Sequence, residues 1–255
     1  MTVRELYAFL NEKIPPALSC SWDNDGLMCA WSMEKEVKRV LVALDITRAV
    51  AEKAIAEGYD VILSHHPMIF HPLKNLNPDD AIAQKAMALI RADVAAMSFH
   101  TRLDAVEGGV NDVLCKKLGL ENVQPFGEGG EAIGRIGDMN AEMTLESFAA
   151  LVKDVTGADA VQYADAGKKV SRVAVLGGGG SSDVDAAFRA GADTYVSGEL
   201  KHSCLTEAPE RGKNLVAAGH FHTEDPVCRR LCQLAQEADP KIIVEIVNSN
   251  PVRVI

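Results

Sequence analysis

Two adjacent histidines, His65 and His66, follow the apolar run 59–64 and are followed at once by Pro67. The run is typical of a buried strand, and the proline prevents the strand from continuing. Both imidazoles therefore stand at the carboxyl end of a strand, where open α/β sheets place their ligand sites. Because imidazole is the commonest protein metal ligand, the pair favours a metal site. A pair of core histidines bonded to backbone carbonyls is the alternative.

A second polar segment follows the next predicted strand, over residues 94–99. His100 and Asp104 come just after this strand, so we expect them at the same edge as the histidine pair. An aspartate in such a position is most often a turn or cap residue. It becomes a candidate metal ligand here because two histidines leave a nearby strand at that edge.

The third polar segment is Gly219-His-Phe-His-Thr-Glu224. If this segment is extended, His220, His222 and Glu224 point to one side. If a helix already begins at His220, then His220 and Glu224 share one helix face instead. Both geometries let His220 and Glu224 converge, and a helix start rich in polar caps is the structural alternative.

Together, His65, His66, Asp104, His220 and Glu224 supply three imidazoles and two carboxylates. One metal ion rarely takes this many side chains and still stays open to a substrate. Two divalent ions about 3.5–4 Å apart would use them well. Mixed nitrogen and oxygen ligands suit zinc, iron, manganese, cobalt or nickel, and the pattern does not choose among these.

Composition limits the functions that the chain can have. The 255 residues carry a formal net charge of -10, which argues against a non-specific nucleic-acid binder because such proteins need a basic face. No secretory segment is apparent, and no apolar stretch reaches the roughly 20 residues that span a bilayer. We expect a cytoplasmic protein without membrane contact. Its six cysteines do not cluster in metal-binding pairs, so we expect reduced, mostly buried thiols.

The order of predicted elements indicates an α/β fold. Helical or strand periodicity predicts helices over 2–14, 47–57, 79–92, 145–156, 182–190 and 223–236, and strands over 37–44, 61–63, 94–99, 170–176, 194–196, 215–218 and 242–247. This alternation predicts mixed or parallel sheets flanked by helices. Residues 125–140 look loosely structured, and Gly177–Gly180 is expected to form a tight strand-to-helix turn rather than an anion site. The loop after it, with Glu199, Lys201 and His202, is expected to be solvated.

The motifs Trp22-Asp-Asn-Asp-Gly-Leu27, Leu44-Asp-Ile-Thr47, Ser64-His-His-Pro-Met-Ile-Phe70, Thr101-x-x-Asp104 with Gly109-Val-Asn111, and Gly219-His220 with Glu224 occur in this order. They resemble the GTP cyclohydrolase I type 2 homologues, also called the Nif-three-like family, in its short form. The resemblance covers nearly the whole chain. The histidine pair and the His-x3-Glu stretch are its specific parts.

The resemblance implies a dinuclear metal site with His65, His66, Asp104, His220 and Glu224 as ligands. It also implies two α/β lobes and a homo-oligomer, in the form of a ring-shaped hexamer, that binds a small-molecule substrate. His222 departs from the family pattern and is our candidate catalytic residue, as a proton shuttle; a group that orients a ligand from behind and an additional metal ligand are the alternatives. If His220 returns to the edge that carries His65, residues 1–124 plus 217–255 form the metal-site lobe and 125–216 an inserted second lobe.

These observations favour a dinuclear-metal-dependent hydrolase acting on a nucleotide or another small phosphorylated metabolite. Two cations would lower the pKa of a water molecule and stabilise the negative charge that develops during hydrolysis. A non-catalytic metal-binding chaperone or regulatory scaffold would use the same ligands. A plain α/β protein with structural histidines is the third alternative.

Overall fold

The histidine pair leaves the middle strand of a five-stranded mixed sheet. The strands are β1 (Gly26–Cys29), β2 (Arg39–Ala43), β3 (Val61–Ser64), β4 (Ala95–Ser98) and β11 (Ile243–Ile246), and their order across the sheet is β1-β4-β3-β2-β11. All neighbours are parallel except β1, which runs antiparallel to β4. Because β3 and β4 are parallel and in register, with Ser64 opposite Ser98, the residues after both strands emerge at one edge. This shared edge is what positions the site.

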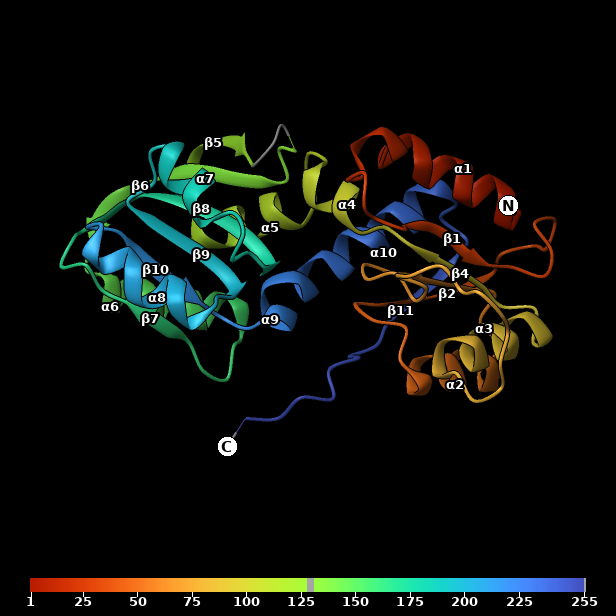
Figure 1. Ribbon diagram of the computed structural model, residues 1–255. Coiled ribbons are helices and arrows are strands. Elements are labelled where there is room, and N and C mark those ends of the chain that lie inside the picture. The colour runs from red at the N-terminus through yellow and green to blue at the C-terminus, as the bar shows by residue number, and fades with distance from the viewer. Residues whose placement is uncertain (128–130, 255) are drawn as a thin grey trace. The chain divides into compact units, whose positions relative to one another are not determined.

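Helices cover both faces of this sheet (Figure 1). They are α1 (Val3–Lys13), α2 (Arg48–Ala56), α3 (Ala81–Arg91), the short α4 (Thr101–Ala105) and α10 (Cys228–Ala238). Helix α1 packs on α10, whereas α2 packs on α3 across the other face. Side-chain caps fix where the helices begin: Thr2 forms a capping box with Glu5, and Thr47 and Asp80 cap α2 and α3. The helices at 2–14, 47–57 and 79–92 are thus confirmed.

Small and branched aliphatic residues fill the core beneath α2 and α3. Leu41, Ile62 and Ala96 from adjacent strands pack against Ala54 of α2 and Leu89 of α3, and all five are almost completely buried. All four residues of β3 and of β4 are buried on both faces of the sheet. This explains why these strands appear in the sequence as continuous apolar runs rather than as an alternation of apolar and polar residues.

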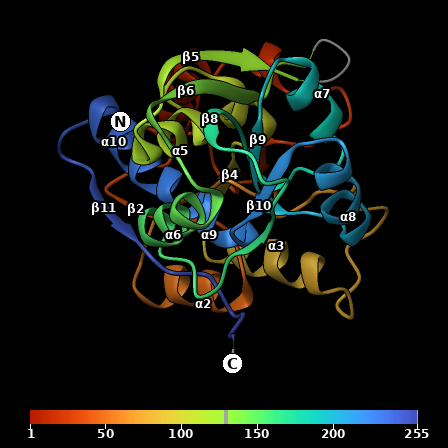
Figure 2. The ribbon, with the colours of Figure 1, turned by 90° about the vertical axis from the view of Figure 1, so that its left-hand side faces the viewer.

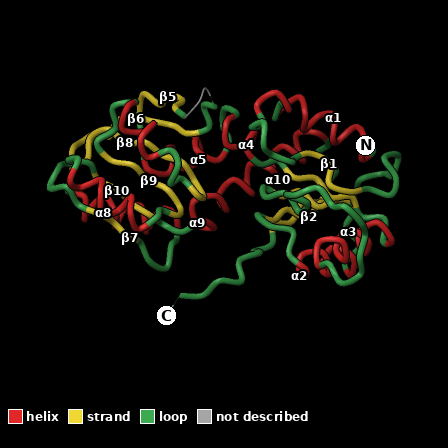
Figure 3. The backbone as a smooth tube through the Cα atoms, viewed as in Figure 1, coloured by secondary structure: helices red, strands yellow, loops and turns green. Residues whose placement is uncertain are grey.

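The second sheet has six strands and is also mixed. They are β5 (Glu121–Phe126), β6 (Gly134–Met143), β7 (Gln162–Ala164), β8 (Val170–Gly179), β9 (Thr194–Glu199) and β10 (Asn214–Ala217), in the order β5-β6-β8-β9-β10-β7. Strands β8, β9 and β10 are parallel, and the flanking pairs are antiparallel. Figure 3 shows the alternation of helices and strands that the sequence predicts.

Helices flank this sheet as well (Figure 2). They are α5 (Val110–Leu118), α6 (Leu145–Thr156), α7 (Val184–Arg189), α8 (His202–Glu210) and α9 (His220–Glu224). Leu114 of α5 and Phe148 of α6 share one hydrophobic core with Val173 of β8. Ala187 of α7 and Ala208 of α8 pack with residues of the opposite face. Two mixed sheets with flanking helices confirm the predicted α/β class.

The computed structural model describes residues 1–127 and 131–254 and divides into two compact units. The first unit contains Met1–Val106 and Val227–Pro251, and the second contains Glu107–Pro226 with the residues from Val252 onward. The lobe bounds predicted from the sequence, 1–124 plus 217–255 and 125–216, stay a prediction.

Several sequence expectations are wrong in detail. Residues 125–140 are largely ordered in β5 and β6, and 128–130 of that range lie outside the described residues. The predicted helix over 223–236 is instead α9, a 3-10 turn at Asp225–Val227 and then α10. Pro226 explains the interruption, since it lacks the backbone N–H that a continuous helix needs and restricts the residue before it. Glu199, Lys201 and His202 are exposed to solvent as the sequence suggested, although Glu199 ends β9 and His202 already begins α8.

The glycine run also differs from its prediction, because Gly177–Gly179 extend β8 instead of forming a turn. Gly178 has a φ of +66°, and a Cβ at this position would lie 2.1 Å from Oε1 of Glu224 and 2.9 Å from Nε2 of His220. The absent side chain therefore lets α9 lie close to β8. A Cβ on the neighbouring Gly179 would meet nothing within 4 Å.

We predict that Gly178→Ala lowers the free energy of unfolding by about 1–3 kcal/mol, because the left-handed backbone and the clash with Glu224 both oppose a Cβ. Gly179→Ala is the matched control and should change stability by no more than about 0.5 kcal/mol. Urea denaturation monitored by circular dichroism measures both variants. Equal midpoints for the two variants would contradict this account of the glycine run.

Candidate metal centre

The two adjacent histidines are each anchored through Nδ1. His65 is buried, and its Nδ1 lies 2.9 Å from the backbone carbonyl oxygen of Phe99. The Nδ1 of His66 lies 2.8 Å from Oδ1 of Asp45, a residue that follows β2. The segments that follow β2, β3 and β4 thus supply Asp45, the two histidines and the Phe99 carbonyl at the same sheet edge.

A third imidazole, His100, lies beside them directly after β4. Its Nδ1 lies 2.9 Å from Oδ1 of Asp23, and its ring centroid is 5.3 Å from that of His65 and 5.7 Å from that of His66. One nitrogen from each of the three histidines lies within 4.8 Å of the others, a spacing that a single metal ion can bridge. Asp104, on α4, places Oδ1 3.7 Å from Nε2 of His65.

The anchoring bonds decide which ring nitrogen is available to a metal. A carbonyl oxygen and an ionised carboxylate only accept hydrogen bonds, so Nδ1 must be the donor in all three histidines. In a neutral imidazole Nε2 then carries the lone pair, which is the form that binds a cation. The three rings present the donor set, and the outer hydrogen bonds, that a divalent transition metal requires. The residues therefore fit the metal that the sequence predicts.

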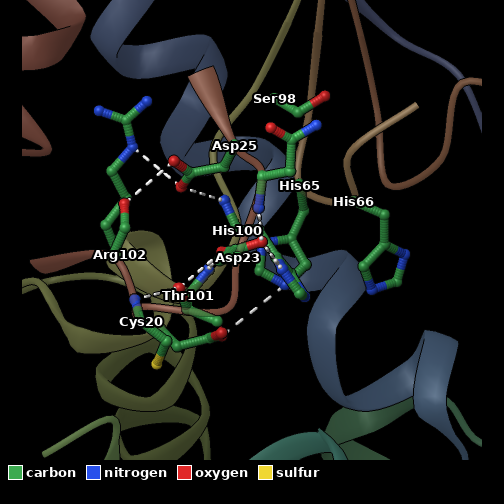
Figure 4. A network of polar contacts seen from close by, with 12 residues as sticks. Cys20, Asp23, Asp25, His65, His66, Ser98, His100, Thr101 and Arg102 are labelled. Atoms are coloured by element: carbon green, nitrogen blue, oxygen red, sulfur yellow. Dashed lines mark hydrogen bonds and ion pairs between the residues drawn. The ribbon is translucent and has the colours of Figure 1, made fainter. Parts of the chain in front are cut away.

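The loop that supplies Asp23 is held by further polar contacts (Figure 4). Asp23 also accepts hydrogen bonds from the backbone N–H and the hydroxyl of Thr101, at 3.0 and 2.6 Å. Asp25 accepts from the backbone N–H of His100 at 3.1 Å and from the buried guanidinium of Arg102 at 3.0 Å. These contacts tie the loop at residues 20–25 to the start of α4.

The environment of Asp23 keeps its carboxylate charged. Burial by itself would raise the pKa of Asp23, but the hydrogen bonds from His100 and Thr101 outweigh burial and hold this pKa well below its ordinary value. The carboxylate is therefore ionised at neutral pH and fixes the orientation of the His100 ring.

In the second unit, His220 and Glu224 lie on one face of α9. Nε2 of His220 is 3.2 Å from Oε2 of Glu224, and Nδ1 of His220 is 3.3 Å from Oε2 of Glu199. The helical alternative for residues 220–224 is therefore confirmed and the extended one is wrong. Glu224 is nearly buried, whereas His220 is partly exposed. An imidazole and a carboxylate at this spacing could serve as a pair of metal donors, with an acidic partner behind the ring.

His222 points elsewhere on α9. Its Nε2 lies 3.9 Å from Oδ2 of Asp159, a residue before β7, and its ring packs edge-on against Phe221 at 5.7 Å between centroids. His222 therefore lies on a different face of α9 from His220 and Glu224.

Sequence reasoning missed the roles of His100, Asp23 and Asp45. All three lie in or beside motifs that the sequence analysis noted, and His100 was placed at the correct sheet edge. The hydrogen bonds that join His66 to Asp45 and His100 to Asp23 link segments 21 and 77 residues apart. No local sequence pattern indicates such contacts.

Comparison with known proteins places the chain in a family. Residues 1–252 match the model of Duf34/NIF3 (NGG1p interacting factor 3). The chain belongs to this family. A GTP cyclohydrolase 1 type 2 homolog of Nostoc sp. is 36% identical over 227 residues, which cover 84% of this chain and 86% of the relative. The family resemblance stated from the motifs is therefore confirmed.

Solved structures agree with the family assignment. The hypothetical protein SA1388 of Staphylococcus aureus is 28% identical, with a TM-score of 0.88 and coverage of 100% of this chain and 99% of the other. Reduced HcgD from Methanocaldococcus jannaschii is 28% identical, with a TM-score of 0.83 and coverage of 96% and 97%. The fold of this Duf34/NIF3 protein is thus that of its relatives over nearly the full length.

Two general expectations can be compared with the structure. None of the six cysteines, all of which the structure describes, forms a disulfide bond. Burial raises the pKa of the Cys115 thiol to about 12 and that of the Cys232 thiol to about 11. Among the residues that the structure describes, every helix is too short or too polar to span a lipid bilayer.

We predict that Asp23→Asn lowers the free energy of unfolding of metal-free protein by about 2 kcal/mol at neutral pH, because hydrogen bonds to a charged group are lost. The native pKa of Asp23 is depressed, so this contribution is complete above about pH 5 and is lost as the pH falls below about 4. Urea titrations at several pH values measure the difference between native protein and variant.

The matched control is Asp185→Asn, which removes an exposed carboxylate paired with Arg211 and should have little effect at any pH. A difference between native protein and Asp23→Asn that persists unchanged at pH 3 would show that Asp23 is not the stabilising charge.

Proposed function

We propose that this Duf34/NIF3 protein is a dinuclear-metal-dependent hydrolase acting on a nucleotide or another small phosphorylated metabolite. The proposed ligands of its two divalent ions are His65, His66, Asp104, His220 and Glu224. The observation that carries the proposal is the set of three imidazoles in the first unit, each with Nδ1 bonded to an acceptor oxygen. A structural role for these rings would need no such uniform choice of nitrogen.

The second unit contributes support of the same kind. His220 and Glu224 are four residues apart on α9, with their donor atoms 3.2 Å apart. Gly178 leaves room for both side chains, since any Cβ there would displace them. His100 adds a candidate nitrogen donor to the five ligands that the sequence predicts.

Bound divalent cations would lower the pKa of a water molecule and polarise a phosphoryl or ring oxygen or nitrogen of the substrate. The chain's own residues would orient the metal ligands and move the proton. Asp45 and Asp23 orient His66 and His100 through Nδ1, and His222 is the proposed group that moves a proton. Oδ2 of Asp159 lies 3.9 Å from Nε2 of His222 and could accept a proton from it through a bridging water molecule.

The proposed substrate class has two sources of support. The mixed imidazole and carboxylate donors suit the hydrolysis of phosphoesters and of ring amidines. The name of the Nostoc relative, GTP cyclohydrolase 1 type 2 homolog, points to a purine nucleotide. We propose further that the protein assembles as a homohexamer, does not bind nucleic acid, and uses zinc, iron, manganese, cobalt or nickel. Light scattering measures the oligomeric state, and binding measurements with a panel of metals identify the ions that the protein uses.

We predict that His65→Ala and Asp104→Ala each lower the metal content of purified protein by at least one of two ions per chain, because each removes a ligand. Inductively coupled plasma mass spectrometry measures the content. His71→Ala is the matched control, since His71 is an exposed histidine that follows the same strand. Native protein that binds no divalent ion, or equal metal content in all variants, would overturn the metal site.

We predict that His222→Ala lowers kcat by about 10²-fold or more with full metal content, as expected for the loss of a proton-transfer group. Turnover is measured by release of inorganic phosphate and by absorbance of the purine ring over a panel of nucleotides. Loss of metal in His222→Ala would make it a ligand instead. Metal-loaded native protein with no turnover on the whole panel would favour the chaperone or scaffold role.

A further inference from the structure

Two exposed aromatic rings lie beside the imidazoles of the first unit. Trp22 is 56% exposed and Phe70 is 37% exposed. Their ring centroids lie 6.2 Å apart, and each ring lies 6.1 Å from His100, with all three pairs edge-on. We propose that Trp22 and Phe70 form a binding site for the planar heteroaromatic ring of a small-molecule ligand.

The loop that presents Trp22 is rigid although the ring itself is exposed. The flanking Asp23 is buried and accepts three hydrogen bonds from the start of α4. The backbone N–H of Cys20 donates to the hydroxyl of Thr101 at 2.9 Å. The indole is therefore held on a fixed backbone rather than on a loose surface loop, which lowers the entropy that a ligand must overcome on binding.

The segment of Phe70 is tied to the same loop. The side-chain amide of Asn24 donates to the backbone carbonyl of Ile69, at 2.5 Å. This bond connects the residues after Pro67 with the loop at 20–25, so that Trp22 and Phe70 are positioned together. A pair of large apolar rings that is rigid and solvent-exposed is characteristic of a recognition site, because burial elsewhere would have been more stabilising.

The chemistry of the pair identifies the ligand. Aromatic side chains stack on the π-face of any nucleobase, and each base has such a face. The neighbouring groups are carboxylates and imidazoles whose Nε2 atoms accept hydrogen bonds, so a heterocycle with ring N–H or exocyclic amino donors suits the site better than a purely apolar group. His100 stands in edge-on contact with both rings, which makes the aromatic pair continuous with the imidazole cluster. This continuity favours a small molecule over a protein partner.

The inference deepens the proposed function by naming the part of the substrate that Trp22 and Phe70 would hold. Binding of the ring requires neither metal nor turnover, so it can be tested separately. The probes are adenosine, guanosine and cytidine, which carry a base without a phosphate, and ribose 5-phosphate, which carries a phosphate without a base. Isothermal calorimetry on the full chain, with and without a chelator, measures their dissociation constants.

Trp22→Ala and Phe70→Ala should each raise the dissociation constant of the best nucleoside by about 5- to 100-fold, in line with the loss of one stacking contact. Trp31→Ala is the matched control, because Trp31 is 73% exposed and is the only other tryptophan in the sequence. Its nucleoside binding should equal that of native protein. Fluorescence gives a second measurement: the nucleoside should quench the emission of Trp31→Phe saturably but leave that of Trp22→Phe unchanged.

Three results would overturn the inference: no nucleoside binding to native protein, equal binding by native protein and both alanine variants, or equal binding of ribose 5-phosphate. Trp22 shielded from iodide in the free protein, together with a changed oligomeric state in the two variants, would instead assign these rings to a contact between copies of the chain. Nucleoside binding without metal or turnover would contradict the proposed hydrolase alone. Turnover without a stacking effect would contradict this inference alone.

Discussion

The hydrogen bond at Nδ1 of each imidazole is the constraint on which the candidate centre of the first unit depends. A backbone carbonyl and two carboxylates fix three rings in the same tautomer, so that Nε2 carries the lone pair in each of them. These acceptors come from three separate segments of the chain. The parallel register of β2, β3 and β4 brings Asp45 and Phe99 to one edge, and the antiparallel pairing of β1 with β4 brings Asp23 there too. The candidate centre therefore depends on strand order as much as on the histidines.

The buried carboxylates of Asp23 and Asp25 stabilise the loop that also presents Trp22. Asp25 compensates the charge of buried Arg102, and Asp23 bridges the loop at 20–25 to the start of α4. An isolated charge buried in such a position would destabilise the fold, whereas here each carboxylate has hydrogen-bond donors beside it. The same contacts hold Trp22 in place, so the hydrogen bonds that stabilise the loop also position the indole ring for the ligand that we infer.

The sequence predicted the fold well where a local signal exists. Thr2, Thr47 and the apolar periodicity were sufficient to locate α1 and α2, and β3 followed from its uniformly apolar run and Pro67. Prediction failed where the backbone is governed by distant contacts. Gly178 extends a strand because α9 packs against it, and the contacts of His100 with Asp23 join segments 77 residues apart. Neither feature has a local pattern that would reveal it.

The first sheet takes its last strand from a distant part of the chain. Strand β11, at Ile243–Ile246, pairs with β2, at Arg39–Ala43, and α10 also comes from beyond the second unit. The six strands of the second sheet, by contrast, all lie within residues 121–217 of one continuous segment. During synthesis on the ribosome, the second sheet can therefore finish folding before β11 is made. Until then, the edge of β2 that pairs with β11 has no strand beside it. The segment that carries the histidine pair is made before the second sheet, yet its own sheet is completed only after all six strands of the second sheet have been made.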